Sequence, residues 1–202
     1  METGTHPFRY WIIDNWCVPS LARAASIEFP DTDWDHWHKY EGTGSLKYAT
    51  KDSLRIPPAC SQILGMLSSL DIESITGETG LFPDVLYHGG GMHMIPSGFF
   101  LGKHLDSNRH PIKGWGRKYS VVLYLSENWD SQWGGELELW DGICMVKKIE
   151  CVFNRLVIFE CTEHSFHSVA YTTKQATEHR KSLACFFWCH KTTGTREKAE
   201  FL

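Results

Sequence analysis

The sequence has no long apolar run, no excess of basic charge and no repeat in its 202 residues. No stretch approaches the ~18 consecutive apolar residues of a membrane-spanning helix. The N-terminus has no basic segment followed by an apolar one, so we predict no secretory signal. The formal net charge of −4 gives no general attraction to nucleic acid or to an anionic membrane. We therefore expect a soluble, cytoplasmic protein whose partners include neither nucleic acid nor membrane.

Cysteines are few, scattered and odd in number: there are seven, and no two are spaced as Cys-x-x-Cys. This pattern argues against a disulfide framework and against a zinc ribbon. We expect free thiols that are mostly buried. The cluster of His36 and His38 has no partner cysteine pair, so it does not predict a zinc site.

The composition is that of an ordinary globular protein, with 42% hydrophobic and 22% charged residues. The length suits one domain, which we predict over 1–202. Apolar spacing and proline positions predict a first strand at 8–13 and helices at 19–29, 58–70 and 72–77. The polar and aromatic stretch 31–53 is expected to be irregular. The segment up to about residue 82 is therefore predicted to be mainly helical support.

The chain changes character after Pro83 and becomes a series of short β-type runs separated by turn residues. Eight strands at this spacing are typical of a double-layered β-barrel or jelly roll, with the helices outside one sheet. The fold class we predict is mainly β (α+β), with the core over about 83–190. The expected strands are 91–95, 99–104, 118–126, 136–139, 143–149, 155–160, 167–171 and 180–189.

The strongest chemical pattern is His104-Leu105-Asp106. Alternate residues of a strand face the same side, so His104 and Asp106 can offer two ligands to one metal. His167, at the start of another β-type run, is the best third ligand, although His164 competes with it. Two histidines and one carboxylate form the facial triad of non-haem Fe(II) oxygenases. A His-x-Asp match alone is weak, because eleven histidines and 24 acidic residues make chance matches common.

A second group of residues suits a dicarboxylate. Arg180 and Ser182 share one face of a predicted strand, and a guanidinium can donate two hydrogen bonds to a carboxylate. Tyr124 lies in an apolar strand and needs a partner for its hydroxyl. Taken singly, Arg180 is an ordinary strand cation and Tyr124 a core tyrosine; together they fit the distal carboxylate of 2-oxoglutarate.

With these residues assembled, the segment 89–188 resembles the catalytic core of the prolyl 4-hydroxylase-like 2-oxoglutarate/Fe(II) oxygenases, and it is also similar to the oxygen-sensing prolyl hydroxylases. The resemblance implies a double-stranded β-helix with flanking N-terminal helices. It covers about half of the chain. The matching stretches are 98–106, 122–129, 134–140, 155–159, 165–167 and 180–184.

The resemblance also implies residue roles. His104, Asp106 and His167 would bind Fe(II), Arg180 and Tyr124 would bind 2-oxoglutarate, and the role of Ser182 carries over more weakly. The expected reaction consumes O₂, converts 2-oxoglutarate to succinate and CO₂, and hydroxylates a C–H bond, with ascorbate as a supporting reductant. Asp106 favours hydroxylation over halogenation, since halogenating relatives lack this carboxylate.

One position departs from the pattern. Many relatives have a tyrosine on the strand before the His-x-Asp motif, where this chain has His93. Either His93 replaces that contact to the co-substrate or the contact is lost. The pair Gly134-Gly135 is predicted to be a turn that opens the next strand.

The resemblance favours a protein substrate, with a peptidyl proline or another side chain as the target. Two alternatives stay open: the same chemistry on a free amino acid or sugar, and a metal-binding jelly roll without enzymatic activity. The aromatic residues Trp34, Trp37 and Tyr40 and the loop 107–117 either line a substrate cleft or cover the end of the barrel.

Overall fold

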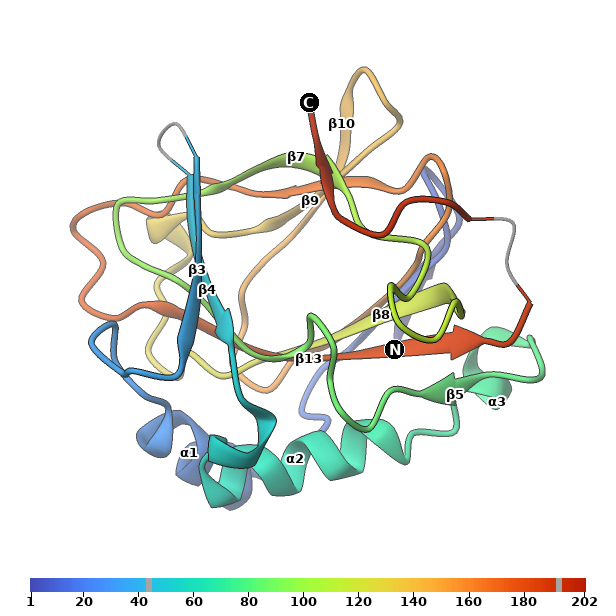
Figure 1. Ribbon diagram of the computed structural model, residues 1–202. Helices are drawn as coiled ribbons and strands as arrows, with labels where there is room; N and C mark the ends of the chain where they lie inside the picture. Colours follow the sequence, from blue (N-terminus) through green and yellow to red (C-terminus); the bar gives the residue numbers. More distant parts are fainter. Residues whose placement is uncertain (43–44, 192–193) are drawn as a thin grey trace.

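The computed structural model describes residues 1–42, 45–191 and 194–202, and places two antiparallel β-sheets face to face, with helices outside one of them (Figure 1). The helices are α1 (Pro19–Glu28), α2 (Pro58–Ser68) and α3 (Ile72–Thr76), with short 3₁₀ turns at Ser53–Arg55 and Ser131–Trp133. The strands of the major sheet are β1 (Glu2–Gly4), β2 (Tyr10–Ile13), β3 (Trp37–Gly42), β4 (Ser45–Thr50), β5 (Phe82–Pro83), β6 (Gly91–Ile95), β8 (Gly116–Tyr124), β11 (Leu156–Glu160) and β13 (Arg180–Cys189). Those of the minor sheet are β7 (Leu101–Leu105), β9 (Leu137–Trp140), β10 (Met145–Ile149), β12 (Phe166–Val169) and β14 (Glu200–Phe201).

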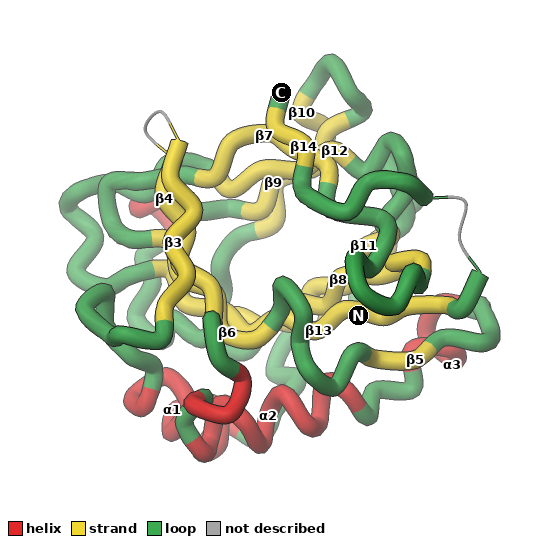
Figure 2. The backbone as a smooth tube through the Cα atoms, in the orientation of Figure 1, coloured by secondary structure: helices red, strands yellow, loops and turns green. Residues whose placement is uncertain are grey.

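The major sheet has the order β1-β2-β11-β8-β13-β6-β4-β3, with β5 on β13, and the minor sheet has the order β10-β9-β12-β7-β14. Figure 2 shows the two sheets as separate layers, with the helices beneath the major sheet. This double-layered jelly roll confirms the predicted fold class. The His-x-Asp strand β7 and the His167 strand β12 are neighbours in the minor sheet, whereas the Arg180 strand β13 lies in the major sheet.

The largest hydrophobic core lies between the helices and one face of the major sheet. Helix α2 contributes the buried side chains Cys60, Ile63, Leu64 and Leu67, at the three- and four-residue spacing of an amphipathic helix. The opposite face of the sheet is turned toward the minor sheet. Because side chains alternate along β13, Leu183 packs in the core while Ser182 and Ala184 face the space between the sheets.

Two expectations about the ends of the chain are wrong. The stretch 31–53 contains the antiparallel hairpin β3–β4, and β4 pairs with β6 at the edge of the major sheet. The first 82 residues therefore supply strands as well as helices. At the other end, the unpredicted strand β14 pairs with β7, beside the His-x-Asp motif. The eight strands predicted after residue 83 are all present, with bounds that differ by a few residues.

All seven cysteines are free, as their spacing predicted, and four of them are buried: Cys17, Cys60, Cys151 and Cys185. Cys161 and Cys189 are partly buried, and Cys144 is exposed. Within the described ranges, no helix is both long enough and apolar enough to cross a membrane.

Candidate metal centre and co-substrate pocket

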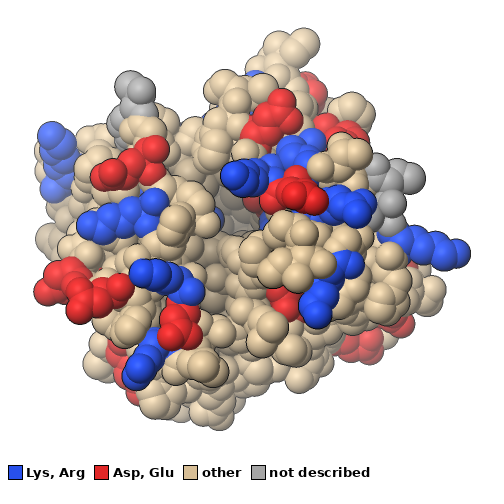
Figure 3. All heavy atoms as spheres, in the orientation of Figure 1, with Lys and Arg blue, Asp and Glu red and all other residues tan. Residues whose placement is uncertain are grey.

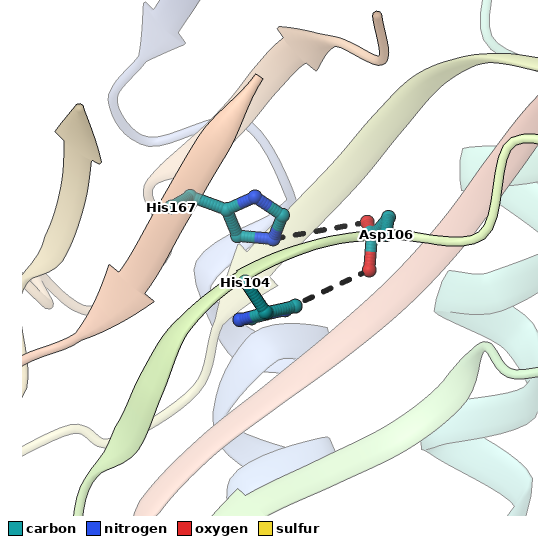
Figure 4. A group of neighbouring side chains, drawn as sticks. All are labelled: His104, Asp106 and His167. Atoms are coloured by element: carbon teal, nitrogen blue, oxygen red, sulfur yellow. Dashed lines mark ion pairs between the residues drawn. The ribbon is translucent and has the colours of Figure 1, made fainter. Parts of the chain in front are cut away.

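His104, Asp106 and His167 converge in the space between the sheets, as the sequence predicted (Figure 4). His104 and His167 are directly opposed in the β7–β12 pair, and their ring centres are 4.2 Å apart. Asp106 follows β7 and points back toward both rings. Its Oδ1 is 3.8 Å from His104 Nε2, and its Oδ2 is 3.7 Å from His167 Nε2. One ligand atom from each residue lies within 4.8 Å of the others, which suits a single bound cation. The competing His164 is exposed in the preceding turn.

Hydrogen bonds to the main chain orient both imidazoles. His104 Nδ1 is 2.8 Å from the carbonyl oxygen of Gly102, and His167 Nδ1 is 2.9 Å from that of Ser165. Because a carbonyl oxygen only accepts, each Nδ1 carries the proton, and each Nε2 keeps a lone pair aimed into the space between the sheets. Burial, together with repulsion from His167, lowers the pKa of His104 to about 3. His104 is therefore neutral at pH 7, the form in which histidine binds a metal.

The carboxylate of Asp106 is held by residues that the sequence analysis missed. Arg117 Nη1 lies 3.0 Å from Asp106 Oδ2, and the Ser120 hydroxyl donates to the same oxygen at 3.2 Å. Arg196 Nε donates to the main-chain carbonyl of Asp106 at 2.8 Å. Burial disfavours the charge, but the Arg117 guanidinium outweighs it and holds the pKa of Asp106 well below its ordinary value. The three-residue group therefore combines two histidine nitrogens with one anionic carboxylate.

Arg180 is buried at the start of β13, with 4% of its surface exposed. Its Nε donates to the carbonyl oxygen of Gly135 at 2.6 Å, and its guanidinium carbon is 4.8 Å from the centre of the Tyr124 ring. Gly134 and Gly135 form the predicted turn before β9, both with φ of 76°. A Cβ on Gly134 would be 2.1 Å from the carbonyl oxygen of Tyr171, so only glycine fits there. This turn also fixes the orientation of the Arg180 side chain.

The hydroxyl of Tyr124 is fully buried, and no hydrogen-bond partner for it is present among the described residues. Burial raises the pKa of Tyr124 to about 12, so the hydroxyl stays protonated and can donate. Leaving such a group unpaired costs about 1–3 kcal/mol. An anion placed beside Tyr124 and Arg180 would accept from both.

Tyr124 and Arg180 line one cavity together with the three converging residues. Ser182 lies between Tyr124 on β8 and His93 on β6 in the sheet, and all three face this cavity. The His93 ring is held through Nε2 by the Gly89 carbonyl oxygen at 2.9 Å, and burial lowers its pKa well below the ordinary value. His93 thus occupies the wall of the cavity as a neutral side chain.

A wider cleft opens outward from this cavity. It runs from His104 and Asp106 between the β3–β4 hairpin and the C-terminal segment, past Tyr40 and Phe201. Phe201 stacks on His104 with ring centres 4.9 Å apart and an angle of 25° between the rings. Of the aromatic residues whose position the sequence left open, Tyr40 lines the cleft, while Trp37, at the start of β3, is buried in the main hydrophobic core.

Comparison with known proteins agrees with this geometry. The family model of the 2OG-Fe(II) oxygenase superfamily matches residues 90–188, about half of the chain. The chain belongs to this superfamily. Prolyl 3-hydroxylase OGFOD1 of Mus musculus is 34% identical over 79 residues, which cover 36% of this oxygenase and 14% of the mouse protein. The match therefore spans only a small part of that relative.

Two solved structures share the fold of this oxygenase. A Pseudomonas putida prolyl-4-hydroxylase aligns with a TM-score of 0.64 and 22% identity, over 90% of this chain and 93% of the other. A Trichoplax adhaerens prolyl hydroxylase, solved with a peptide fragment of the hypoxia inducible factor oxygen degradation domain, also aligns with a TM-score of 0.64 and 22% identity. That alignment covers 89% of this chain and 83% of the Trichoplax chain.

The donor set fits the cofactors that define the superfamily, Fe(II) and 2-oxoglutarate. Two histidine nitrogens and one carboxylate are the ligands typical of non-haem Fe(II) oxygenases. The unpaired Tyr124 hydroxyl beside a buried guanidinium suits one carboxylate of a dicarboxylic co-substrate.

Proposed function

We propose that this oxygenase hydroxylates an unactivated C–H bond of a protein side chain, with a peptidyl proline as the first candidate. In this proposal His104, Asp106 and His167 bind Fe(II), and Arg180 and Tyr124 bind the distal carboxylate of 2-oxoglutarate. Ser182 supports that carboxylate from the same strand. The observation on which the proposal rests is the three-ligand group at one end of a cavity and the buried, unpaired Tyr124 hydroxyl in the wall of the same cavity.

When bound, the metal and its co-substrate activate O₂, and 2-oxoglutarate is oxidised to succinate and CO₂. The protein supplies position and charge. Gly135 aims Arg180, so the guanidinium can pair with a carboxylate without reorganisation. Neutral His104 presents Nε2, and Arg117 keeps Asp106 ionised. Apolar walls that include Leu101, Val122 and Phe186 limit the entry of water.

A protein substrate is supported by the shape of the entrance. The cavity beside the three ligands has a volume of about 70 Å³, while the cleft outside it has a volume of about 500 Å³. A polypeptide segment can lie in such a cleft and insert one side chain. The Mus musculus relative is a prolyl 3-hydroxylase and the Trichoplax protein is a prolyl hydroxylase with a bound peptide, which favours the same substrate class here. Both sheets enclose one cavity, which supports a single catalytic domain over 1–202.

Release of succinate from 2-oxoglutarate, in the presence of Fe(II) and ascorbate, tests the chemistry. We expect turnover by the wild-type protein and none by His104→Ala or Asp106→Ala, with circular dichroism unchanged. His164→Ala is the matched control, since that histidine is exposed and outside the group. Metal binding without succinate release would support the non-enzymatic jelly roll. A mass gain of one oxygen on proline peptides, compared with free amino acids and sugars, separates the protein substrate from the small-molecule alternative.

A further inference from the structure

The outer cleft continues well beyond the three converging residues. It meets a second hollow along His38, Tyr40, His88 and Gly89, which line both. The second hollow extends between the hairpin strand β4 and the loop around Ile112. Figure 3 shows this face, hollowed near its centre, with Lys and Arg side chains on both sides of the hollow. The two parts together form one groove that starts at the metal centre.

Unpaired lysines line this groove along its length. Lys47 and Lys198 lie in the part near the metal centre, and Lys51 and Lys113 lie in the distal part. None of the four makes an ion pair or a side-chain hydrogen bond with another described residue, and Lys47 Nζ lies 5.9 Å from the centre of the Tyr40 ring. Lys118, Lys147 and Lys148 elsewhere on the surface are paired with carboxylates, whereas Lys39 lies over the Tyr48 ring.

The acidic side chains of the groove are already engaged. Asp106 pairs with Arg117, and Asp84 accepts two main-chain N–H groups and faces His110. Asp52 accepts from the Leu54 N–H, and Glu197 lies 3.7 Å from Arg109. The lining has five cations (Lys47, Lys51, Lys113, Lys198 and Arg117) and four carboxylates, and two of those carboxylates pair with Arg55 and Arg109 from outside the lining. The groove therefore has a modest excess of positive charge in a chain whose net charge is −4. A local field of this sign attracts and orients anionic partners.

Lys47 has the most informative position. It lines both the inner cavity and the outer groove, so it stands where a substrate would pass from one to the other. Burial lowers its pKa to about 8, with Asp106 opposing and Arg117 and Arg180 adding to the effect. Arg117 is already paired with Asp106, and Arg180 faces the co-substrate pocket. The ammonium of Lys47 is therefore left for a group that arrives with the substrate.

We propose that the groove recognises an extended acidic polypeptide segment, with carboxylates along the part of the segment that follows the groove away from the metal centre. The inference rests on the proposed function, which it refines by naming the charge of the substrate. Lys47 would meet the carboxylate nearest the hydroxylated residue, and Lys51 and Lys113 would meet those farther along the chain.

The test measures binding without turnover. Three fluorescein-labelled peptides each contain one proline in an alanine and glycine background. They differ only at four positions that flank the proline, which are all Glu, all Gln or all Lys, and they are called the Glu, Gln and Lys peptides. Their affinity for the Fe(II) enzyme, saturated with 2-oxoglutarate in the absence of oxygen, is measured by anisotropy. We expect the Glu peptide to bind about tenfold more tightly than the Gln peptide, with the difference shrinking as salt rises. We expect the affinity for the Glu peptide to fall by about two- to fivefold in each of three variants, Lys47→Gln, Lys51→Gln and Lys113→Gln.

Lys39→Gln is the matched control. Lys39 lies on the same hairpin, but its ammonium is 5.3 Å from the centre of the Tyr48 ring and it does not line the groove. Its substitution should leave the affinity of the Glu peptide unchanged. Equal binding of the Gln or Lys peptide, or equal losses in the Lys39 and Lys47 variants, would overturn the inference.

Free glutamate separates the two sources of a carboxylate. If glutamate displaces the labelled peptide at a similar concentration, the groove binds small acids and the polypeptide inference is wrong. Succinate release and peptide oxidation are measured separately on the same samples. If the peptides are hydroxylated equally whatever their flanking charge, the proposed function is supported and only the inference about substrate charge is wrong. Absence of turnover would remove the proposed function, while the anisotropy would still report on charge.

Discussion

Arg117 lies with Nη1 3.0 Å from Asp106 Oδ2, and it is the only Lys or Arg of the described chain within 4.0 Å of that carboxylate. The guanidinium carbon is 3.7 Å from the centre of the Phe186 ring, and the Nε of Arg117 has no hydrogen-bond partner in the described part of the protein. Stacking and one ion pair therefore hold this arginine. Its function in the fold is to neutralise a buried carboxylate that also faces two imidazoles.

Arg117→Gln should destabilise the metal-free protein by about 1.5–3 kcal/mol, because Asp106 would lose its ion-pair partner while it stays largely buried. A divalent cation supplies a replacement positive charge in the folded state only, so metal should restore much of this loss. Urea unfolding with and without Mn(II) measures both effects.

Arg155→Gln provides the control for that experiment. Arg155 makes two hydrogen bonds to Asp14, at 2.6 and 3.1 Å, at the ends of β11 and β2 and outside the metal centre. Its removal should cost no more than about 1 kcal/mol, with no difference between the metal-free and Mn(II)-loaded proteins. If the Arg117 and Arg155 variants respond to Mn(II) in the same way, Arg117 has no special relation to the metal centre.

His167→Gln should abolish both metal retention and succinate release, whereas His164→Gln should preserve both. The two histidines are three residues apart, but only His167 lies opposite His104 and presents Nε2 to Asp106. Removal of an outer-shell partner costs about 10–100-fold in metal affinity, and we expect loss of a direct ligand to cost more. Iron content after dialysis and initial rates of succinate release measure the two effects. Full iron retention by the His167 variant would exclude it as a ligand.

The sequence predicted the converging residues because each lies on, or directly after, a strand with clear alternation. His104 and Asp106 are two apart, Arg180 and Ser182 are two apart, and the two-residue period of a strand places each pair on one side. The pairing of β7 with β12, which brings His167 to His104, could be expected only through the resemblance to the oxygenases. Alternation within one strand says nothing about which strand is its neighbour.

Arg117 was missed for a local reason. Ser120, Val122 and Tyr124 face the cavity, so simple alternation places Lys118 on the same side and Arg117 on the other. The β8–β13 pair has an irregularity in register between Phe187 and Trp188, where Trp188 is paired with Arg117 and position 118 is skipped. A bulge of this kind turns Arg117 inward, and a single sequence gives little warning of one.

The hairpin β3–β4 and the strand β14 escaped prediction because their stability comes from tertiary contacts. Their residues are largely polar, and β3 after Trp37 is exposed along its length. β3 and β14 are edge strands, and both elements depend on a neighbour that is distant in the sequence, since β4 pairs with β6 and β14 pairs with β7. These elements supply Lys47, Tyr40 and Phe201 to the outer cleft. These residues were therefore less predictable than His104 and Asp106, which line the same cleft.

Arg180→Gln should raise the concentration of 2-oxoglutarate needed for half-maximal succinate release by about 10- to 150-fold. A charge-assisted hydrogen bond is worth about 1.5–3 kcal/mol, and the change leaves no cation beside Tyr124. Tyr124→Phe removes one neutral donor and should raise the same concentration by only about two- to twelvefold. Isothermal titration of 2-oxoglutarate into the Mn(II)-loaded proteins measures both losses without turnover. Equal affinities in all three proteins would remove both residues from the co-substrate pocket.

Phe201→Ala tests the stacking of the C-terminal strand on His104, a proposed metal ligand. The Phe201 ring covers His104 from the side of the cleft, and it is 52% exposed. Its loss should cost about 0.5–1.5 kcal/mol of stability, which is the range for an aromatic pair. The larger effect should be on the coupling between succinate release and hydroxylation of the substrate, because water would reach His104 from the cleft. We expect succinate release in the absence of a second substrate to increase relative to the wild type.

Tyr171→Ala is a matched control for Phe201, since Tyr171 is an aromatic residue of similar exposure (51%) that does not line the cleft. It should change neither the stability beyond ~0.5 kcal/mol nor the rate of substrate-free succinate release. Phe201→Leu keeps an apolar cover over His104 without an aromatic face, so its uncoupled rate should fall between those of the wild type and the alanine variant. If all three variants release succinate at the wild-type rate, β14 is a structural edge strand and the stacking does not shield the metal centre.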